Sequence, residues 1–121
     1  MTFLRPADMI AREPLPGWSG RFFHAANMTF AHYDIAEGAQ PLHEHQHEQE
    51  EVWHIISGEV ALTVGGTEAT LTAGSVAIVP PETPHWVRPL GPCRAKIADY
   101  PLRPNLSGPL QPGDDSGTTS P

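Results

Sequence analysis

The sequence predicts an all-β domain, a sandwich or barrel of short strands, from three observations. Apolar residues alternate with polar ones, as at Val60, Leu62 and Val64, which is the period of a strand with one buried face. The 11 glycines and 14 prolines divide the chain into short segments. No segment has the periodicity of a long helix, and 121 residues are enough for one domain with one core.

The elements follow in chain order from these signals. Residues 1–20 contain three prolines, and we expect an irregular N-terminal arm that lays Leu15 or Trp18 on the domain. The barrel is expected over residues 21–104. Gly65-Gly66 predicts a two-residue hairpin, because glycine reaches the positive φ of primed turns. Residues 105–121, rich in Pro, Gly and Ser, are expected to form a flexible tail. The expected strands are 22–24, 28–36, 41–47, 51–57, 59–65, 67–72, 75–79, 85–90 and 93–99.

Charge and cysteine content limit the partners and the compartment. Seven Lys and Arg against fourteen Asp and Glu give a net charge of −7, and no basic cluster lies along the sequence. Nucleic acid and anionic membranes are therefore not expected as partners, whereas a small-molecule substrate is. Cys93 is the only cysteine, which rules out an intramolecular disulfide and favours a reducing compartment. The first residues do not resemble a signal peptide and no apolar run is long enough to span a membrane, so a cytoplasmic location is expected.

Residues 43–51 concentrate histidine and glutamate. If this segment is extended, His43, His45 and His47 project from one face, with neighbours about 7 Å apart at Cα. Two imidazoles on that face can share one metal ion. A solvated loop of alternating His and Glu is the alternative interpretation.

A second signal lies in residues 74–85, where an apolar strand ends in a proline-rich turn followed by one histidine. Taken together, the two segments resemble the two motifs of the cupin superfamily: Gly…His-x-His…Glu…Gly, then Gly…Pro…His. The matching residues are Gly38, His45, His47, Glu51 and Gly58 in the first motif, and Gly74, Pro80 and His85 in the second. This resemblance implies a double-stranded β-helix, the jelly-roll barrel of small single-domain cupins.

The resemblance also implies a metal centre. Its ligands would be His45, His47, Glu51 and His85, a set that suits one divalent transition metal such as Fe, Mn, Ni, Cu or Zn. The match departs from the usual pattern in three places, one of them Pro89, which stands where the motif often has Asn. Six residues rather than five separate Gly38 from His45, so His43 is an alternative ligand and otherwise a residue at the rim of the pocket. Glu82 stands where the motif usually has glycine.

The alternation of side chains along the strands indicates further site residues outside the two motifs. Trp53 and Ile55 share the parity of Glu51, and Val87 shares that of His85, so with His43 these residues are expected to line the substrate pocket. Trp86 should point outward. Arg21 and Arg88 are the cations expected to meet an anionic substrate, with an ordinary surface ion pair as the alternative for each.

The sequence determines the function less closely than the fold, because proteins with one fold catalyse many different reactions. The resemblance implies a metal-dependent enzyme on a small organic substrate, first of all an oxygenase of the dioxygenase type, with Glu51 as a catalytic base. A redox-neutral isomerase, hydratase or lyase on sugar-derived or enolisable ketones is the second interpretation. A non-catalytic small-molecule-binding or sensing barrel is the third. A homodimer, formed through an edge strand or an exchanged N-terminal arm, is also expected.

Overall fold

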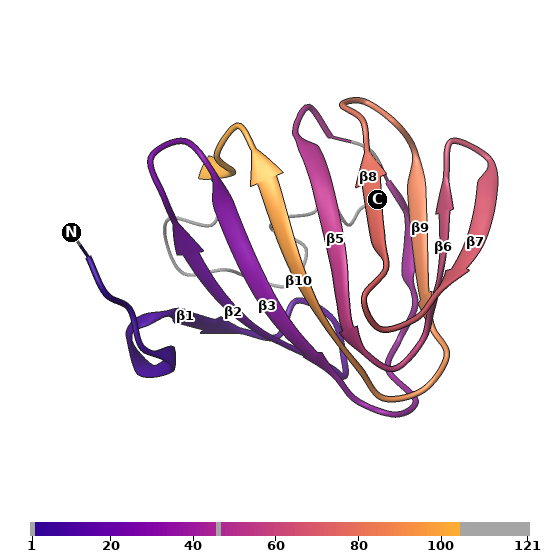
Figure 1. The fold of residues 1–121 in the computed structure, drawn as a ribbon, viewed down its shortest axis with the longest axis horizontal. Coiled ribbons are helices and arrows are strands. Elements are labelled where there is room, and N and C mark those ends of the chain that lie inside the picture. The colour runs from indigo at the N-terminus through magenta and orange to yellow at the C-terminus, as the bar shows by residue number, and fades with distance from the viewer. Residues whose placement is uncertain (1, 46, 105–121) are drawn as a thin grey trace.

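The computed structural model describes residues 2–45 and 47–104, without the side chains of residues 43–45. It confirms the all-β fold, with two antiparallel sheets that enclose one core (Figure 1). The six-stranded sheet has the order β1 (Ile10–Arg12), β2 (Trp18–His24), β3 (Thr29–Ile35), β10 (Cys93–Tyr100), β5 (Glu50–Ser57), β8 (Val76–Val79). The four-stranded sheet has the order β4 (Leu42–His45), β9 (His85–Pro89), β6 (Val60–Val64), β7 (Thr67–Leu71).

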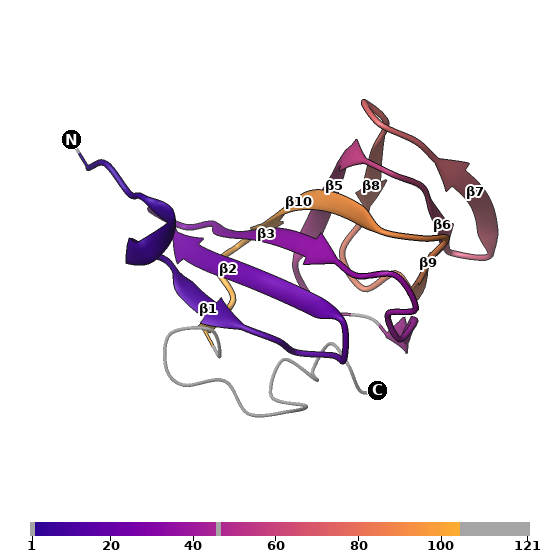
Figure 2. The same ribbon diagram turned by 90° about the horizontal axis from the view of Figure 1, so that it is seen from below.

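The N-terminal segment is more regular than the sequence predicts. The expectation of an irregular arm over residues 1–20 is wrong in two places, because β1 lies within it and β2 begins at Trp18 rather than at residue 22. Ile10 pairs with Phe22 across β1 and β2, and Trp18 is 2% exposed. Figure 2 shows β1 and β2 on the far side of the molecule from β6 and β7. A three-residue strand next to prolines is too short to give a periodic signal. The tail expected over residues 105–121 lies outside the described residues.

Alternation along the two central strands separates the core from the outer surface. In β5, Glu51, Trp53 and Ile55 are buried. In β10, Ala95 and Ile97 are buried while Lys96 between them lies outward. Successive residues of a strand point to opposite faces, so this pattern follows directly from the pleat. The parity prediction for β5 is therefore confirmed.

The hairpin predicted at Gly65-Gly66 is present between β6 and β7. Both glycines have positive φ, 55° and 90°, and Val64 pairs with Thr67 across the turn. A turn in which both central residues have positive φ matches the twist of the flanking strands.

The described part of the chain contains a single short helical turn, η1 (Pro6–Asp8), and no helix there is long and apolar enough to cross a membrane.

Gly58→Ala is expected to destabilise the fold. Gly58 has φ +80°, and a Cβ at this position would lie 2.6 Å from Cβ of Cys93. The left-handed backbone costs an L-residue roughly 1–2 kcal/mol, and the overlap adds about 1–3 kcal/mol. Gly38→Ala is the matched control, since Gly38 has φ +76° with no atom near the added Cβ. Urea unfolding should give a larger loss for Gly58→Ala, and equal losses would contradict the packing argument.

Candidate metal centre

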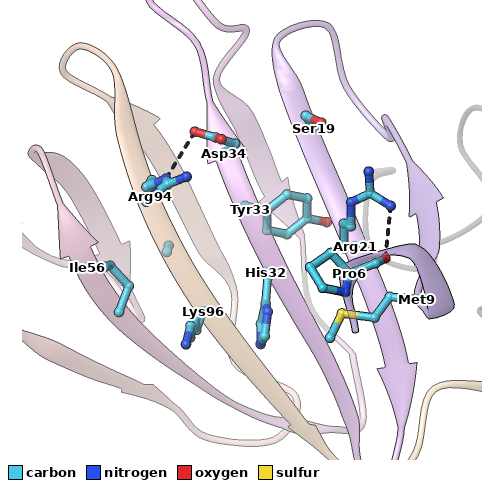
Figure 3. A pocket seen from close by; sticks show the side chains of 11 residues that line it. Pro6, Met9, Ser19, Arg21, His32, Tyr33, Asp34, Ile56, Arg94 and Lys96 are labelled. Atoms are coloured by element: carbon cyan, nitrogen blue, oxygen red, sulfur yellow. Dashed lines mark hydrogen bonds and ion pairs between the residues drawn. The ribbon is translucent and has the colours of Figure 1, made fainter. Parts of the chain in front are cut away.

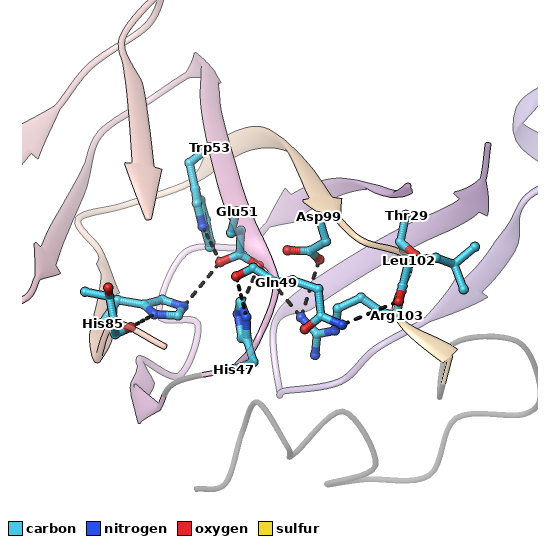
Figure 4. A network of polar contacts seen from close by, with 10 residues as sticks. Thr29, His47, Gln49, Glu51, Trp53, His85, Asp99, Leu102 and Arg103 are labelled. Carbon is cyan, nitrogen blue, oxygen red and sulfur yellow. Dashed lines mark hydrogen bonds and ion pairs between the residues drawn. The ribbon is translucent and has the colours of Figure 1, made fainter. Parts of the chain in front are cut away.

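Three side chains from separate segments converge at one end of the core (Figure 4). Glu51 comes from β5, His85 begins β9, and His47 lies in the connection between β4 and β5. The Nε2 atom of His85 lies 3.2 Å from Oε1 of Glu51, and Nε2 of His47 lies 3.7 Å from Oε2. One ligand atom from each residue lies within 4.8 Å of the others, so the three could hold one metal ion.

Backbone carbonyls fix which nitrogen of each imidazole faces the cluster. Nδ1 of His85 donates to the carbonyl of Thr83 at 2.9 Å, and Nδ1 of His47 donates to the carbonyl of Gln49 at 3.1 Å. A carbonyl oxygen can only accept, so the proton must be on Nδ1 in both rings. In the neutral imidazole this leaves the lone pair on Nε2, directed at the cluster. Such bonds orient the histidine ligands of metal sites. The described donors therefore fit a divalent transition metal.

Proton equilibria in the cluster suit metal binding. Burial by itself raises the pKa of Glu51, but the hydrogen bond from His85 and the charges of the two histidines hold it well below its usual range. Burial lowers the pKa of His47. Burial also opposes the charge on His85, yet the hydrogen bond to Glu51 raises its pKa overall. Glu51 is thus ionised, and a metal cation would compete with the proton that His85 shares with it.

Trp53 holds the Glu51 carboxylate in place. Its Nε1 donates a hydrogen bond of 2.8 Å to Oε1 of Glu51, and its indole meets that of Trp18 edge-on at 6.2 Å. Trp53 is 2% exposed. The contact with substrate expected from parity stays a prediction, while the hydrogen bond gives this side chain a second role that parity does not reveal.

Two buried polar side chains beside the cluster, Asp99 and Arg103, were not predicted from the sequence. Asp99 lies opposite Glu51 in the register of β10 and β5. Nη1 of Arg103 lies 3.4 Å from Oδ2 of Asp99 and 3.8 Å from Oε2 of Glu51. Both residues are 5% exposed. Burial and the charge of Glu51 raise the pKa of Asp99 well above its usual range, against the opposing effect of Arg103.

The sequence indicates Asp99 more clearly than Arg103. Asp99 continues the inward parity of Ala95 and Ile97, so alternation alone could have indicated it. Arg103 follows the last strand in a proline-rich segment, where no periodicity applies. Its backbone N–H donates to Oγ1 of Thr29, and this long-range contact fixes the segment beside the site.

Other predicted site residues are distributed as follows. The backbone of His45 pairs with that of His85 across β4 and β9, but the side chains of His43 and His45 lie outside the described part. Their roles as rim residue and ligand stay predictions. Ile55 and Val87 are both fully buried, with 0% exposure.

The cations expected to meet an anionic substrate do not reach this cluster. Arg88 pairs with Glu68 on the outside of the four-stranded sheet, and Arg21 lies on the outer face of β2. The arginine that lies beside Glu51 in the described part of the chain is Arg103, which follows β10.

The proline-rich turn between β8 and β9 joins the two halves of the cluster. Glu82, at the position where glycine was expected, adopts φ +57°, a left-handed conformation that favours glycine. Its N–H donates to the carbonyl of His47 at 2.7 Å. The turn that delivers His85 thus also positions the segment that carries His47.

Comparisons with known proteins agree with this architecture. The family model described as a cupin domain matches residues 31–98, more than half of the chain. No curated protein matches the chain significantly.

Three solved structures share the fold. An RmlC-like cupin from Shewanella frigidimarina NCIMB 400 is 20% identical, covering 88% of this chain and 96% of its own, with a TM-score of 0.79. KdgF from Halomonas sp. is 18% identical over 88% of this chain and 98% of its own, also with a TM-score of 0.79. A variant of oxalate decarboxylase from Bacillus subtilis is 16% identical over 81% of this chain and 29% of its own, with a TM-score of 0.72.

Proposed function

Because this chain belongs to the cupin family, we propose that it is a metal-dependent enzyme that moves protons on a small organic substrate carrying a carboxylate. The observation that carries the proposal is the buried pair of Asp99 and Arg103 beside the candidate metal ligand Glu51. An acid and a cation sealed next to a metal-binding cluster supply proton transfer and anion recognition, which a purely structural ion does not need.

The metal would be held by His47, Glu51 and His85, with His45 as the predicted fourth ligand. A bound divalent metal acts as a Lewis acid that polarises a substrate oxygen. Oxalate decarboxylase from Bacillus subtilis, which has the same fold, contains Mn(II) centres. The donor set of this chain suits Fe, Mn, Ni, Cu or Zn, and elemental analysis of the purified protein identifies which one it carries.

Asp99 is the proposed proton carrier. Burial and the charge of Glu51 raise the pKa of Asp99, which favours the protonated carboxyl group, the form that acts as a general acid. Arg103 would bind a substrate carboxylate through its guanidinium, whose fork of N–H donors matches that group. Trp53 keeps Glu51 oriented, so that the substrate meets a fixed array of charges. Together these roles describe redox-neutral chemistry, such as isomerisation, hydration or elimination.

Asp99→Asn and Arg103→Gln are expected to reduce turnover differently. Asp99→Asn should lower kcat by about 10²- to 10⁴-fold, because it removes the transferable proton while preserving shape. Arg103→Gln should mainly raise KM for a carboxylate substrate and have little effect on an esterified analogue. Arg88→Gln is the control, since Arg88 is an exposed arginine away from the cluster. Unchanged kinetics in both variants, with the metal retained, would contradict the proposal.

An oxygenase is the second candidate, favoured by one specific observation. The described donors are two histidines and one carboxylate, the set found in non-haem iron oxygenases. A panel of enols, catechols, diketones and uronates, assayed with and without oxygen, separates the candidates. Turnover in anaerobic buffer supports the redox-neutral proposal, whereas turnover that requires oxygen uptake supports the oxygenase. Tight binding without turnover would instead support a sensing barrel.

The homodimer and the cytoplasmic location remain predictions. Exposed apolar side chains compatible with a dimer include Ile56 and Trp86, at 39% and 42% exposure. Light scattering should give twice the chain mass of 13.1 kDa, and the mass of a single chain at micromolar concentration would contradict the dimer.

A further inference from the structure

The outer face of the six-stranded sheet carries four basic side chains in one register row. Arg21 of β2 is opposite His32 of β3, His32 is opposite Lys96 of β10, and Lys96 is opposite His54 of β5. We call these four residues the basic row. They are exposed or half-buried, whereas their neighbours along the strands face the core. The row cannot be seen in the sequence, because β-sheet pairing brings together residues from four separate strands.

The basic row contains two permanent cations, Arg21 and Lys96, and two histidines. Arg21 and Lys96 are both opposite His32, so its imidazole lies between two cations. Burial and the charge of Lys96 lower the pKa of His32. Asp34, an acidic residue exposed on the same strand as His32, already pairs with Arg94 at 3.5 Å. Arg21 and Lys96 therefore give this face a local positive charge in a chain of net charge −7, and such a charge favours an anionic ligand.

A pocket lies over this row (Figure 3). Its volume is about 430 Å³, and its lining includes Arg21, His32, Arg94 and Lys96. Nη1 of Arg21 donates to the backbone carbonyl of Pro6 at 3.0 Å, which holds the guanidinium at the pocket wall. The pocket is therefore concave and cationic, with one side chain already positioned.

An apolar row lies next to the basic row on the same face. Phe23, Phe30, Ala98 and Val52 are successive register partners across the same four strands. The rings of Phe23 and Phe30 stack with centroids 5.0 Å apart. A second pocket of about 350 Å³ is lined by this apolar row and shares His32 and Lys96 with the first pocket. The two pockets thus adjoin at the basic row.

We propose that this face binds an amphipathic organic anion, with a carboxylate or phosphate head over the basic row and an apolar body over the apolar row. The positive charge of the basic row is complementary to an anionic head, and Phe23 and Phe30 offer an apolar surface to the body of the ligand. A second copy of the chain docked here about a two-fold axis through the row would bring two basic rows together, and their repulsion disfavours that occupant. The face lies on the opposite side of β5 and β10 from the candidate metal centre, so this site is independent of the proposed catalytic function.

Calorimetric titration of the full chain with octanoate and with octyl phosphate tests the proposal. Each probe combines an anionic head with an eight-carbon body, and the tighter of the two identifies the preferred head. 1-Octanol lacks the charge and inorganic phosphate lacks the body, so each should bind at least about tenfold more weakly.

Two substitutions on this face test whether the probes bind there. Lys96→Gln and Phe30→Ala should each weaken the tighter probe by about tenfold or more, while the control Arg88→Gln should leave its affinity unchanged. Lys96→Gln should also melt close to the parent chain, because Lys96 is exposed at the surface of the sheet.

Three results would overturn the proposal: no binding of either probe at millimolar concentration, equal affinity in Lys96→Gln, or a dimer in light scattering that Phe30→Asp dissociates. The last result would mean that a second copy covers this face.

Discussion

His85→Ala is expected to weaken metal binding by more than about 100-fold. Residues that only support metal ligands typically cost 10- to 100-fold when changed, so loss of a ligand should cost more. His85 is fully buried, with its Nε2 atom 3.2 Å from Glu51, and no other described histidine besides His47 lies in the cluster. Glu51→Gln should have a similar effect, because the amide carries no charge to balance the cation. Competition with a chromogenic chelator measures both affinities.

His54→Ala is the matched control for this loss. His54 lies on β5, three residues from Glu51, but on the exposed outer face of the sheet. Its removal should leave metal affinity within about twofold of the parent chain, since no ligand or ligand support is touched. Equal loss in His54→Ala and His85→Ala would mean that metal binds nonspecifically to surface histidines.

Trp53→Ala is expected to cost about 3–5 kcal/mol of stability, the usual cost of truncating a buried aromatic side chain. Trp53 is 2% exposed and packs edge-on against Trp18. Trp53→Phe keeps most of the ring volume but removes the donor to Glu51. This second variant should fold and yet bind metal about 10- to 100-fold more weakly, because the carboxylate loses its support.

Trp86→Ala provides the comparison for Trp53. Trp86 is 42% exposed on the other side of β9, so its loss should cost less stability and leave metal affinity intact. Urea unfolding and chelator competition on the three variants separate packing from ligand support. Parental metal affinity in folded Trp53→Phe would show that the hydrogen bond to Glu51 does not support the site.

Local pattern predicted most of the strands, and the resemblance to the cupin motifs predicted all three members of the described cluster. Alternation of apolar and polar residues encodes which face of a strand is buried, so the inward placement of Trp53 and Ile55 was predictable. His47, Glu51 and His85 followed from the resemblance of two segments to the two cupin motifs. Strand β1 could not be predicted, because its three residues form a strand only by pairing with β2.

Contacts between distant segments account for what the sequence did not predict. Arg103 reaches Glu51 only because the chain turns back after β10 and bonds to Thr29, 74 residues earlier. The basic row likewise depends on the register of four strands. Sequence spacing carries no information about such register until the pairing is known.

Anomalous scattering from crystals grown with Mn(II) or Zn(II) tests the central claim, that this chain is a metal-binding cupin whose centre contains His47, Glu51 and His85. The predicted result is one strong peak about 2.0–2.2 Å from Nε2 of both histidines and from a carboxylate oxygen of Glu51. A peak at another place on the chain, or none at saturating metal, would contradict it.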